Sequence, residues 1–138
     1  MGKIKIILVD DHQIVRDGIK ALLTDVEDID IISEASDHNV LREKLNLQNP
    51  DIIIMDISLP EISGLELAKR LSESHPEIKV IILSMYTDED FIFNAIKSGA
   101  KGYLPKNTTR KEIIDAIRAV YAGEEYFSES ISNIIVSK

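Results

Sequence analysis

Five short apolar runs, rich in β-branched residues, alternate along this chain with segments of helical periodicity. The runs cover residues 4–9, 29–33, 52–55, 80–83 and 102–104. A segment with the apolar spacing of an amphipathic helix lies between each pair of runs, and a fifth such segment follows the last run. This regular strand–helix alternation favours parallel strands that are joined by right-handed crossover helices.

The expected fold is a flavodoxin-like, doubly wound α/β sandwich of the (βα)5 type. Runs 4–9, 52–55 and 80–83 are almost entirely apolar, which is typical of central strands covered by helices on both faces. Run 29–33 alternates more between apolar and polar residues, and run 102–104 is short, so we expect both strands at the edges of the sheet. Five parallel strands then form a three-layer sandwich with the sheet order 2-1-3-4-5.

Short local motifs predict where the helices start and end. Three segments begin with the spacing of a capping box, and two glycines stand where helices are expected to end. The capping pairs are Ser63 with Glu66, Thr87 with Asp90 and Thr109 with Glu112, and the glycines are Gly99 and Gly123.

The composition is that of a single acidic domain. The chain has 138 residues, a net charge of -8 and an apolar fraction of 44%, which is enough for one buried core. The negative charge disfavours binding of nucleic acid or anionic membranes by these residues. The absence of cysteine excludes a disulfide framework, a thiol nucleophile and a Cys-based zinc site. No apolar segment has the length of a signal peptide or a membrane span, so we expect a soluble, cytoplasmic protein.

Polar side chains follow the predicted strands at the edge where a doubly wound sheet binds ligands. Asp10 and Asp11 follow the first strand, and Asp56 follows the third. Ser84 ends the fourth strand, and Lys106 follows the fifth. The order of such a sheet reverses between strands one and three, and ligands bind beyond the carboxyl ends of the strands at that point. Three acids, one hydroxyl and one ammonium are therefore expected to converge there.

Three converging carboxylates are expected to bind a divalent cation. Two carboxylates ~5 Å apart repel by about 3 kcal/mol at an effective dielectric constant of ~20, which is large beside a domain stability of ~5–15 kcal/mol. An all-oxygen site suits magnesium better than zinc. With Mg²⁺ bound, a carboxylate at the cleft can attack an activated phosphoryl donor while the cation and Lys106 offset charge on the transferring oxygens.

Each of these residues also has an ordinary structural interpretation. Asp10 or Asp11 alone is more often a helix N-cap than a metal ligand, and Asp56 alone can cap a turn. Their joint placement at successive strand ends is what favours a functional site. The chain also has three histidines, which share no metal-ligand spacing and are expected to be surface or capping residues. They are His12, His38 and His75.

The ordered set of motifs resembles the receiver domain of two-component response regulators. The motifs are ILVDDH at 7–12, IIMDISLPEISG at 53–64, ILS at 82–84 and GYLPK at 102–106. The resemblance extends over residues 3–122, nearly the whole chain. No single motif is decisive, but the ordered set is highly specific.

This resemblance implies a role for each residue of the cluster. Asp56 is the implied phosphoacceptor, and Lys106 is implied to contact the phosphoryl group. Asp11 and Asp56 are implied to hold Mg²⁺ directly, and Asp10 partly through water. The backbone carbonyl of Ser58 is a further implied ligand. The implied switch pair is Ser84 and Tyr103, with Tyr103 rotating inward after Ser84 moves toward the phosphoryl group.

Three further segments are similar to the NarL/LuxR branch of that family. They are VDDHQIVRDGI at 9–19, GAKGYLPKN at 99–107 and AIRAVYAGEEYFS at 116–128. Members of this branch carry a C-terminal helix-turn-helix domain that binds DNA. We therefore expect a receiver domain over residues 1–123 and the start of a linker over residues 124–138. Residues 126–138 are expected to form at most a short helix, with no sixth strand.

The partners implied by the resemblance are a sensor histidine kinase as phosphoryl donor and, after phosphorylation, a second copy of the chain. DNA is implied only through the C-terminal domain, and no membrane is involved. Tyr86 is predicted either to cover the phosphoryl group and prolong its lifetime or to point into solvent. Pro105 precedes Lys106 and Asn107 follows it, so a cis bond after Lys106 is not expected.

Three other functions remain as alternatives. An aspartyl-nucleophile phosphatase or phosphotransferase usually has a second acid two residues after the nucleophile, where this chain has Ser58. A flavin or nucleotide module on the same fold is disfavoured because the glycine-rich phosphate motifs are missing. A stand-alone or degenerate receiver that acts only as a protein-interaction module is the closest alternative, and the intact acids, Ser84 and Lys106 disfavour it.

Overall fold

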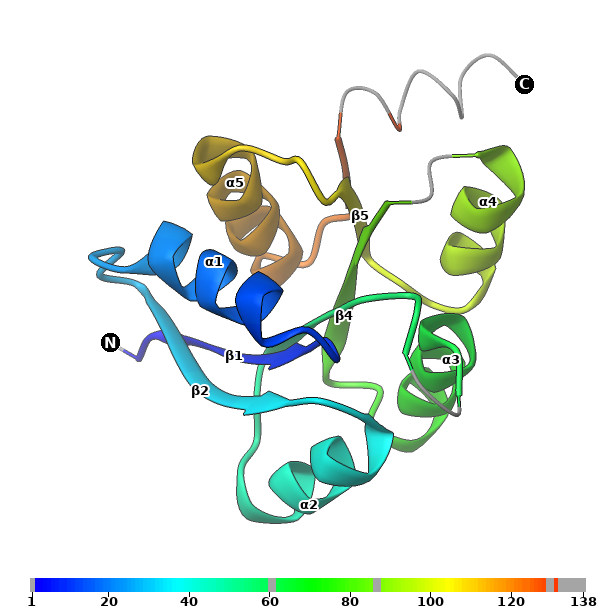
Figure 1. The fold of residues 1–138 in the computed structure, drawn as a ribbon, viewed down its shortest axis with the longest axis horizontal. Coiled ribbons are helices and arrows are strands. Elements are labelled where there is room, and N and C mark those ends of the chain that lie inside the picture. Colours follow the sequence, from blue (N-terminus) through cyan, green and yellow to red (C-terminus); the bar gives the residue numbers. More distant parts are fainter. Residues whose placement is uncertain (1, 60–61, 86–87, 129–130, 132–138) are drawn as a thin grey trace.

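A six-stranded parallel sheet with helices on both faces forms the protein (Figure 1). The computed structural model describes residues 2–59, 62–85, 88–128 and 131. The sheet has the order β2-β1-β3-β4-β5-β6, and every neighbouring pair of strands is parallel. The strands are β1 (Ile4–Val9), β2 (Ile29–Ala35), β3 (Ile52–Met55), β4 (Lys79–Ser84), β5 (Gly102–Pro105) and β6 (Tyr126–Phe127). The predicted doubly wound fold is confirmed.

Five helices within the described residues cover the sheet, two on one face and three on the other (Figure 1). They are α1 (Gln13–Leu23), α2 (His38–Leu47), α3 (Gly64–Ser74), α4 (Glu89–Lys97) and α5 (Arg110–Tyr121). Helices α1 and α5 pack with one set of strand side chains, and α2, α3 and α4 pack with the other set. No helix among the described residues is both long and apolar enough to cross a membrane.

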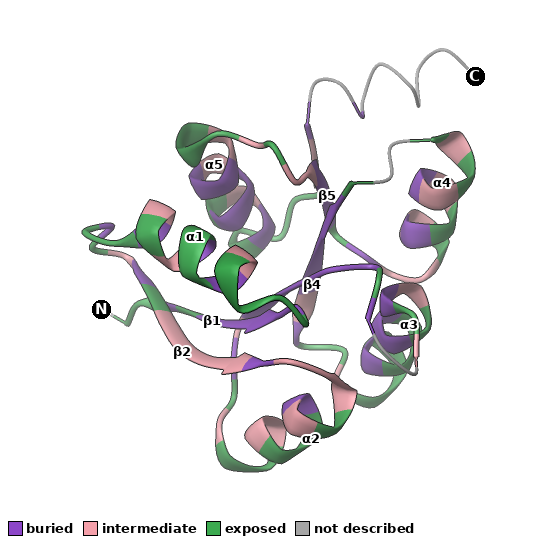
Figure 2. Ribbon diagram, in the orientation of Figure 1, coloured by how far each residue is buried: buried purple, intermediate pink, exposed green. Residues whose placement is uncertain are grey.

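Alternate residues of the central strands supply the two halves of the core. In β1, Ile7 and Val9 face α2 and α3, while Ile6 and Leu8 face α1 and α5. All four are at most 1% exposed. Figure 2 shows the central strands as buried and the outer surface of α1 as exposed. Burial on both faces explains why these strands read as continuous apolar runs rather than as alternating ones.

The sixth strand corrects the expectation that no strand follows α5. Residues Tyr126–Phe127 pair in parallel with β5, so β5 is not the edge of the sheet. A Cβ at Gly102 would lie 3.2 Å from the carbonyl oxygen of Tyr126, so the missing side chain lets the two strands approach closely. Ile131 is also fully buried in the core. A two-residue strand is too short to produce a recognisable sequence periodicity.

At two of the three predicted capping boxes, the hydroxyl of the N-cap residue makes its expected bond. The hydroxyls of Ser63 and Thr109 accept hydrogen bonds from the backbone N–H three residues later, at 3.2 and 3.1 Å. Helix α4 differs, because its N-cap is Asp88 and makes no side-chain cap. Thr87, the residue expected to cap it, lies outside the described residues.

Both helix-terminating glycines have the left-handed backbone conformation that favours glycine. Gly99, after α4, has a φ of 95°, and Gly123, after α5, has a φ of 98°. Their predicted positions at the ends of helices are therefore confirmed.

Gly64, at the start of α3, brings this helix against the segment after β3. Its N–H donates a 2.7 Å hydrogen bond to the carbonyl of Ile57. A Cβ at this position would lie 2.7 Å from the Cα of Ile57 and closer still to the carbonyl oxygen of Asp56. Only glycine therefore allows this approach, which fixes the backbone on which Asp56 is carried.

Candidate functional site

The carboxylates predicted to converge do so at the carboxyl ends of β1 and β3. Asp10 and Asp56 are each only 4% exposed. The N–H of Asp56 donates to the carbonyl of Val9, so adjoining strand ends hold the two acids side by side. Asp10, Asp11, His12 and Asp56 each have one potential ligand atom within 4.8 Å of the others. Topology thus assembles the acidic cluster from two distant parts of the sequence.

Lys106 joins the two buried acids of the cluster. Its Nζ lies 3.0 Å from Oδ2 of Asp56 and 3.3 Å from Oδ2 of Asp10. Its backbone N–H donates to the carbonyl of Ser84, which fixes the loop after β5. Burial alone would lower the pKa of Lys106, but the hydrogen bond to Asp56 and the charges of Asp56 and Asp10 outweigh burial and raise it. Lys106 is therefore a fixed positive charge within the cluster.

Ser84 and Tyr103 meet behind this charged cluster. Both residues are fully buried, and a side-chain hydrogen bond joins them. Burial raises the pKa of the Tyr103 phenol, the bond to Ser84 opposes this effect, and the charges of Asp88 and Asp56 add to it. We expected Tyr103 to turn inward only after Ser84 moves. The structure places Tyr103 inward already, because its ring fills the core between the sheet and the helices α3 and α4.

Ser58, a further predicted ligand, lies beside the cluster. Ser58 is exposed, and its backbone N–H donates to Oδ1 of Asp56 at 3.2 Å. Metal coordination by its carbonyl stays a prediction. Tyr86 lies outside the described residues. The described residues contain no cis peptide bond, so the bond between Lys106 and Asn107 is trans, as expected.

His12 also belongs to the cluster, although we did not predict it. Its Nδ1 lies 3.1 Å from Oδ1 of Asp10 and 2.9 Å from Oδ1 of Asp11. The residue occupies the N-cap position of α1, but its side chain makes no capping hydrogen bond. The expectation of a surface or capping residue is confirmed, because the side chain is 61% exposed. Its position directly after the two acids was the available sequence signal.

Arg16 supports the loop that carries the acids, and it too was missed. Its guanidinium donates to the carbonyl of Asp10 through Nη1, to Gln13 through Nη2 and to Glu34 of β2 through Nε at 3.0 Å. Lys20 reaches the other oxygen of Glu34 at 2.8 Å. These contacts tie α1 to the edge strand and hold the backbone of Asp10. The available sequence signal was an arginine within the segment that is predicted to form an amphipathic helix.

The donor set of this cluster fits Mg²⁺. Three carboxylates at one point exceed the charge of one ammonium, so the cluster retains a net negative charge for a small divalent cation. Magnesium prefers oxygen ligands and keeps several water molecules, which suits a site with few protein ligands. The residues that would hold the ion are Asp11 and Asp56, with Asp10 beside them.

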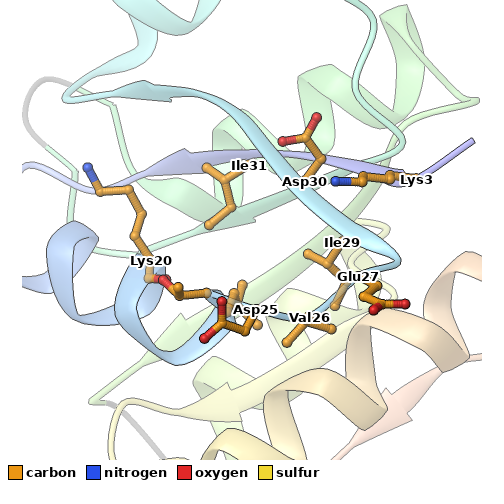
Figure 3. A pocket seen from close by; sticks show the side chains of 10 residues that line it. Lys3, Lys20, Asp25, Val26, Glu27, Ile29, Asp30 and Ile31 are labelled. Atoms are coloured by element: carbon orange, nitrogen blue, oxygen red, sulfur yellow. The ribbon is translucent and has the colours of Figure 1, made fainter.

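One of two surface hollows lies beside the cluster, and the other lies away from its acids. One, of about 470 Å³, is lined by Ser84, Met85, Pro105, Lys106 and Asn107 and opens directly beside Lys106. The other, of about 570 Å³, lies by the edge strand β2 and the end of α1 (Figure 3). None of the acids of the cluster lines it, and its own lysines and acids oppose one another in charge.

The sequence and the fold both match known proteins. The family model described as "Response regulator receiver domain" matches residues 6–118. The chain belongs to the response regulator receiver family. A receiver of this family is a signalling domain. The receiver fold is also seen in the isolated REC domain of RcsB from Salmonella enterica serovar Typhimurium, with a TM-score of 0.89 at 24% identity over 96% of this chain and 99% of that one.

Two similar relatives are named as regulatory proteins. The receiver is 38% identical over 135 residues to the oxygen regulatory protein NreC of Staphylococcus haemolyticus (strain JCSC1435), covering 97% of this chain and 62% of that protein. It is 32% identical to the transcriptional regulatory protein DegU of Brevibacillus brevis, and the match covers 99% of this chain and 58% of that protein. The chain thus spans about three fifths of the length of these relatives.

A solved structure supports the branch within the family. The receiver is 30% identical, with a TM-score of 0.92, to a two-component response regulator of the LuxR family from Aurantimonas sp. SI85-9A1. The match covers 99% of this chain and 97% of that one. The predicted resemblance to the NarL/LuxR branch is therefore confirmed.

The ion pairs of Glu34 predict a pH dependence of stability. The hydrogen bond from Lys20 lowers the pKa of Glu34, burial opposes this effect, and Arg16 adds to it. A lowered pKa stabilises the fold above the unfolded-state value of ~4.3, and this stability is lost as the pH falls through the folded-state pKa. In urea unfolding, Glu34→Gln is expected to be less stable than wild type by about 1 kcal/mol at pH 7, with the difference vanishing near pH 3. Glu73→Gln, on the exposed surface of α3, is the control, and an equal loss at both pH values would contradict the prediction.

Crowding of the carboxylates predicts a second effect on stability. Asp10→Asn removes repulsion from two acids and one attraction to Lys106, while an amide oxygen can still accept from the N–H of His12. Without magnesium, the melting temperature is expected to rise by about 3–5 °C, which corresponds to about 1 kcal/mol. Added Mg²⁺ is expected to raise it less than in wild type. A fall of the metal-free melting temperature would instead assign Asp10 mainly a hydrogen-bonding role.

Proposed function

We propose that this receiver accepts a phosphoryl group on Asp56 from a sensor histidine kinase and thereby switches the activity of a transcription regulator. The observation that carries the proposal is the contact of the Lys106 ammonium with two buried carboxylates from different strands. A partly buried lysine at that position stabilises negative charge where a phosphoryl group would arrive. The proposal also draws on family membership and on the relatives named as regulators.

The chemistry is a displacement at phosphorus. An oxygen of Asp56 attacks the phosphorus of a phosphohistidine, and the P–N bond breaks as the new O–P bond forms. The leaving imidazole takes up a proton, and Asp56 becomes an acyl phosphate. In the structure, Ser58 N–H and Lys106 Nζ contact the two different oxygens of Asp56 and orient its carboxylate. After transfer, Lys106 is close enough to neutralise a phosphoryl oxygen.

Magnesium, when bound, supplies positive charge that stabilises the phosphoryl oxygens in the transition state. The chain's own part is to hold the ion with Asp11 and Asp56, with Asp10 acting partly through water and the Ser58 carbonyl as a further ligand. We also assign to the receiver the catalysis of its own phosphorylation and later dephosphorylation. It remains a signalling switch, since the acyl phosphate is the signal and not a product released to another pathway.

The switch acts through Ser84 and Tyr103. A phosphoryl group adds about one to two negative charges beside Ser84, whose hydroxyl can donate to the new oxygens. The hydroxyl now bonded to Tyr103 would then change partner, and the surface formed by α4, β5 and α5 would adjust around the ring. A changed surface of this kind can select a second copy of the chain.

The output is proposed to lie beyond the receiver. The linker expected over residues 124–138 is proposed to begin only after residue 131, because β6 and Ile131 belong to the receiver core, and to lead to a C-terminal domain that binds DNA in a cytoplasmic protein. The relatives support this because they are longer than the matched segment. The closest alternative, a degenerate or stand-alone receiver that only binds partners, is disfavoured by the ordered contacts of Lys106 with Asp10 and Asp56.

Intact mass measures the proposed reaction directly. Incubation with a small-molecule phosphodonor and Mg²⁺ is expected to add one phosphoryl group, about 80 Da, to wild type and none to Asp56→Asn. Omission of magnesium is expected to reduce the yield at least tenfold. Asp51→Asn, at a carboxylate outside the cluster, serves as the control. Equal phosphorylation of Asp56→Asn would reject Asp56 as the acceptor.

The switch has its own test by amide NMR of the phosphorylated protein. In wild type, phosphorylation is expected to shift resonances of α4 and β5 as well as those around Asp56. In Ser84→Ala, the site resonances should still shift, but the shifts in α4 and β5 should shrink by about half or more, because the hydroxyl that links them is gone. Unchanged shifts in α4 and β5 would mean that Ser84 does not transmit the signal.

A further inference from the structure

His12 holds its imidazole over the acids of the site, and the geometry there is that of a metal ligand. The ring is 61% exposed, yet its Nδ1 is turned back to within 3.1 Å of Asp10 and 2.9 Å of Asp11. An exposed side chain at a helix N-terminus is free to extend into solvent or to cap the helix, and this one does neither. Its backbone N–H donates to the same oxygen of Asp10, which anchors the residue at the cluster.

These distances match a single coordination sphere. Two ligand atoms at bond lengths of about 2.1 Å and at right angles lie about 3 Å apart, and opposite ligands lie about 4.2 Å apart. The Nδ1 of His12 lies 3.1 Å from an oxygen of Asp10 and 2.9 Å from an oxygen of Asp11, which is the spacing of two ligands at right angles. One ligand atom from each of Asp10, Asp11, His12 and Asp56 lies within 4.8 Å of the rest. The widest of these spacings is up to about 0.6 Å more than the spacing of opposite ligands, so one octahedral cation can contact the ring nitrogen together with the carboxylates once the side chains shift by a few tenths of an ångström.

We propose that His12 is a nitrogen ligand of this site and makes the receiver bind first-row transition cations such as Ni²⁺ and Co²⁺ more tightly than Mg²⁺. The inference rests on the metal site of the proposed function and deepens it. Imidazole suits nickel, copper, zinc and iron, whereas magnesium prefers oxygen ligands and dehydrates reluctantly. His12 thus stays a hydrogen-bonding neighbour of a bound Mg²⁺ and becomes a direct ligand of the softer ions.

Coordination by His12 uses the lone pair of Nδ1, so the ring must then carry its proton on Nε2, and water can carry the proton because the ring is exposed. Lys106 need not leave for this step, since it contacts Oδ2 of Asp10 whereas His12 contacts Oδ1.

Calorimetric titration of the untagged, metal-free chain with Ni²⁺ and with Mg²⁺ tests the proposal. Wild type is expected to bind Ni²⁺ at least about tenfold more tightly than Mg²⁺. His12→Asn is expected to weaken Ni²⁺ binding about tenfold or more and to change Mg²⁺ binding less than about twofold. The unchanged Mg²⁺ affinity also demonstrates that the variant is folded. His75→Asn, at the end of α3 where His75 contacts Ser74, is the matched control and should bind both ions as wild type does.

Proton NMR with Co²⁺ gives an independent signature. A histidine bound to Co²⁺ shows a strongly shifted, exchangeable ring N–H resonance, which is expected in wild type and in His75→Asn but not in His12→Asn. Equal Ni²⁺ affinity of wild type and His12→Asn, or persistence of that resonance in His12→Asn, overturns the role of His12.

The variant Asp56→Asn separates this failure from a failure of the proposed function. This variant is expected to bind both Ni²⁺ and Mg²⁺ more weakly than wild type does. Unchanged binding of both ions by Asp56→Asn would place the metal elsewhere and reject the shared site. If Asp56 is phosphorylated and binds magnesium while His12→Asn binds Ni²⁺ as wild type does, only the inference about His12 fails.

Discussion

The contact of one ammonium with two buried carboxylates is the interaction on which the site depends. Asp10 and Asp56 are almost fully removed from water, and each would be costly to bury without a positive partner. Lys106 supplies that partner from the loop after β5, and its backbone bond to Ser84 holds the loop in place. Under the proposed function, the same charge that stabilises the acids would also lie beside a phosphoryl group on Asp56.

The packing around the site explains why this arrangement is rigid. The missing side chain of Gly64 lets α3 approach the backbone of Asp56, and Arg16 holds the carbonyl of Asp10 from the other side of the sheet. Behind the acids, Tyr103 is buried and bonded to Ser84, so the core and the charged cluster share one hydrogen bond. This bond is the contact through which the proposed switch would act.

Much of the fold and of the site could be predicted from the sequence, because both follow from local patterns and one topological rule. The apolar runs give the strands, and the doubly wound order places the acids after β1 and β3 together. The failures share a physical cause. Strand β6 has only two residues and depends on the space beside Gly102. The inward position of Tyr103 depends on how the core packs, which no local pattern encodes.

The sequence by itself determined the parallel sheet, its order through β5 and the identity of the acids, the hydroxyl and the lysine at its edge. These features depend on periodicity and on residues at strand ends, which a linear pattern records. Only the tertiary structure decided that the ring of His12 turns back to the acids, that Arg16 joins Glu34 to the carbonyl of Asp10, and that a sixth strand extends the sheet. Side-chain direction and contacts between distant elements are set by packing in three dimensions.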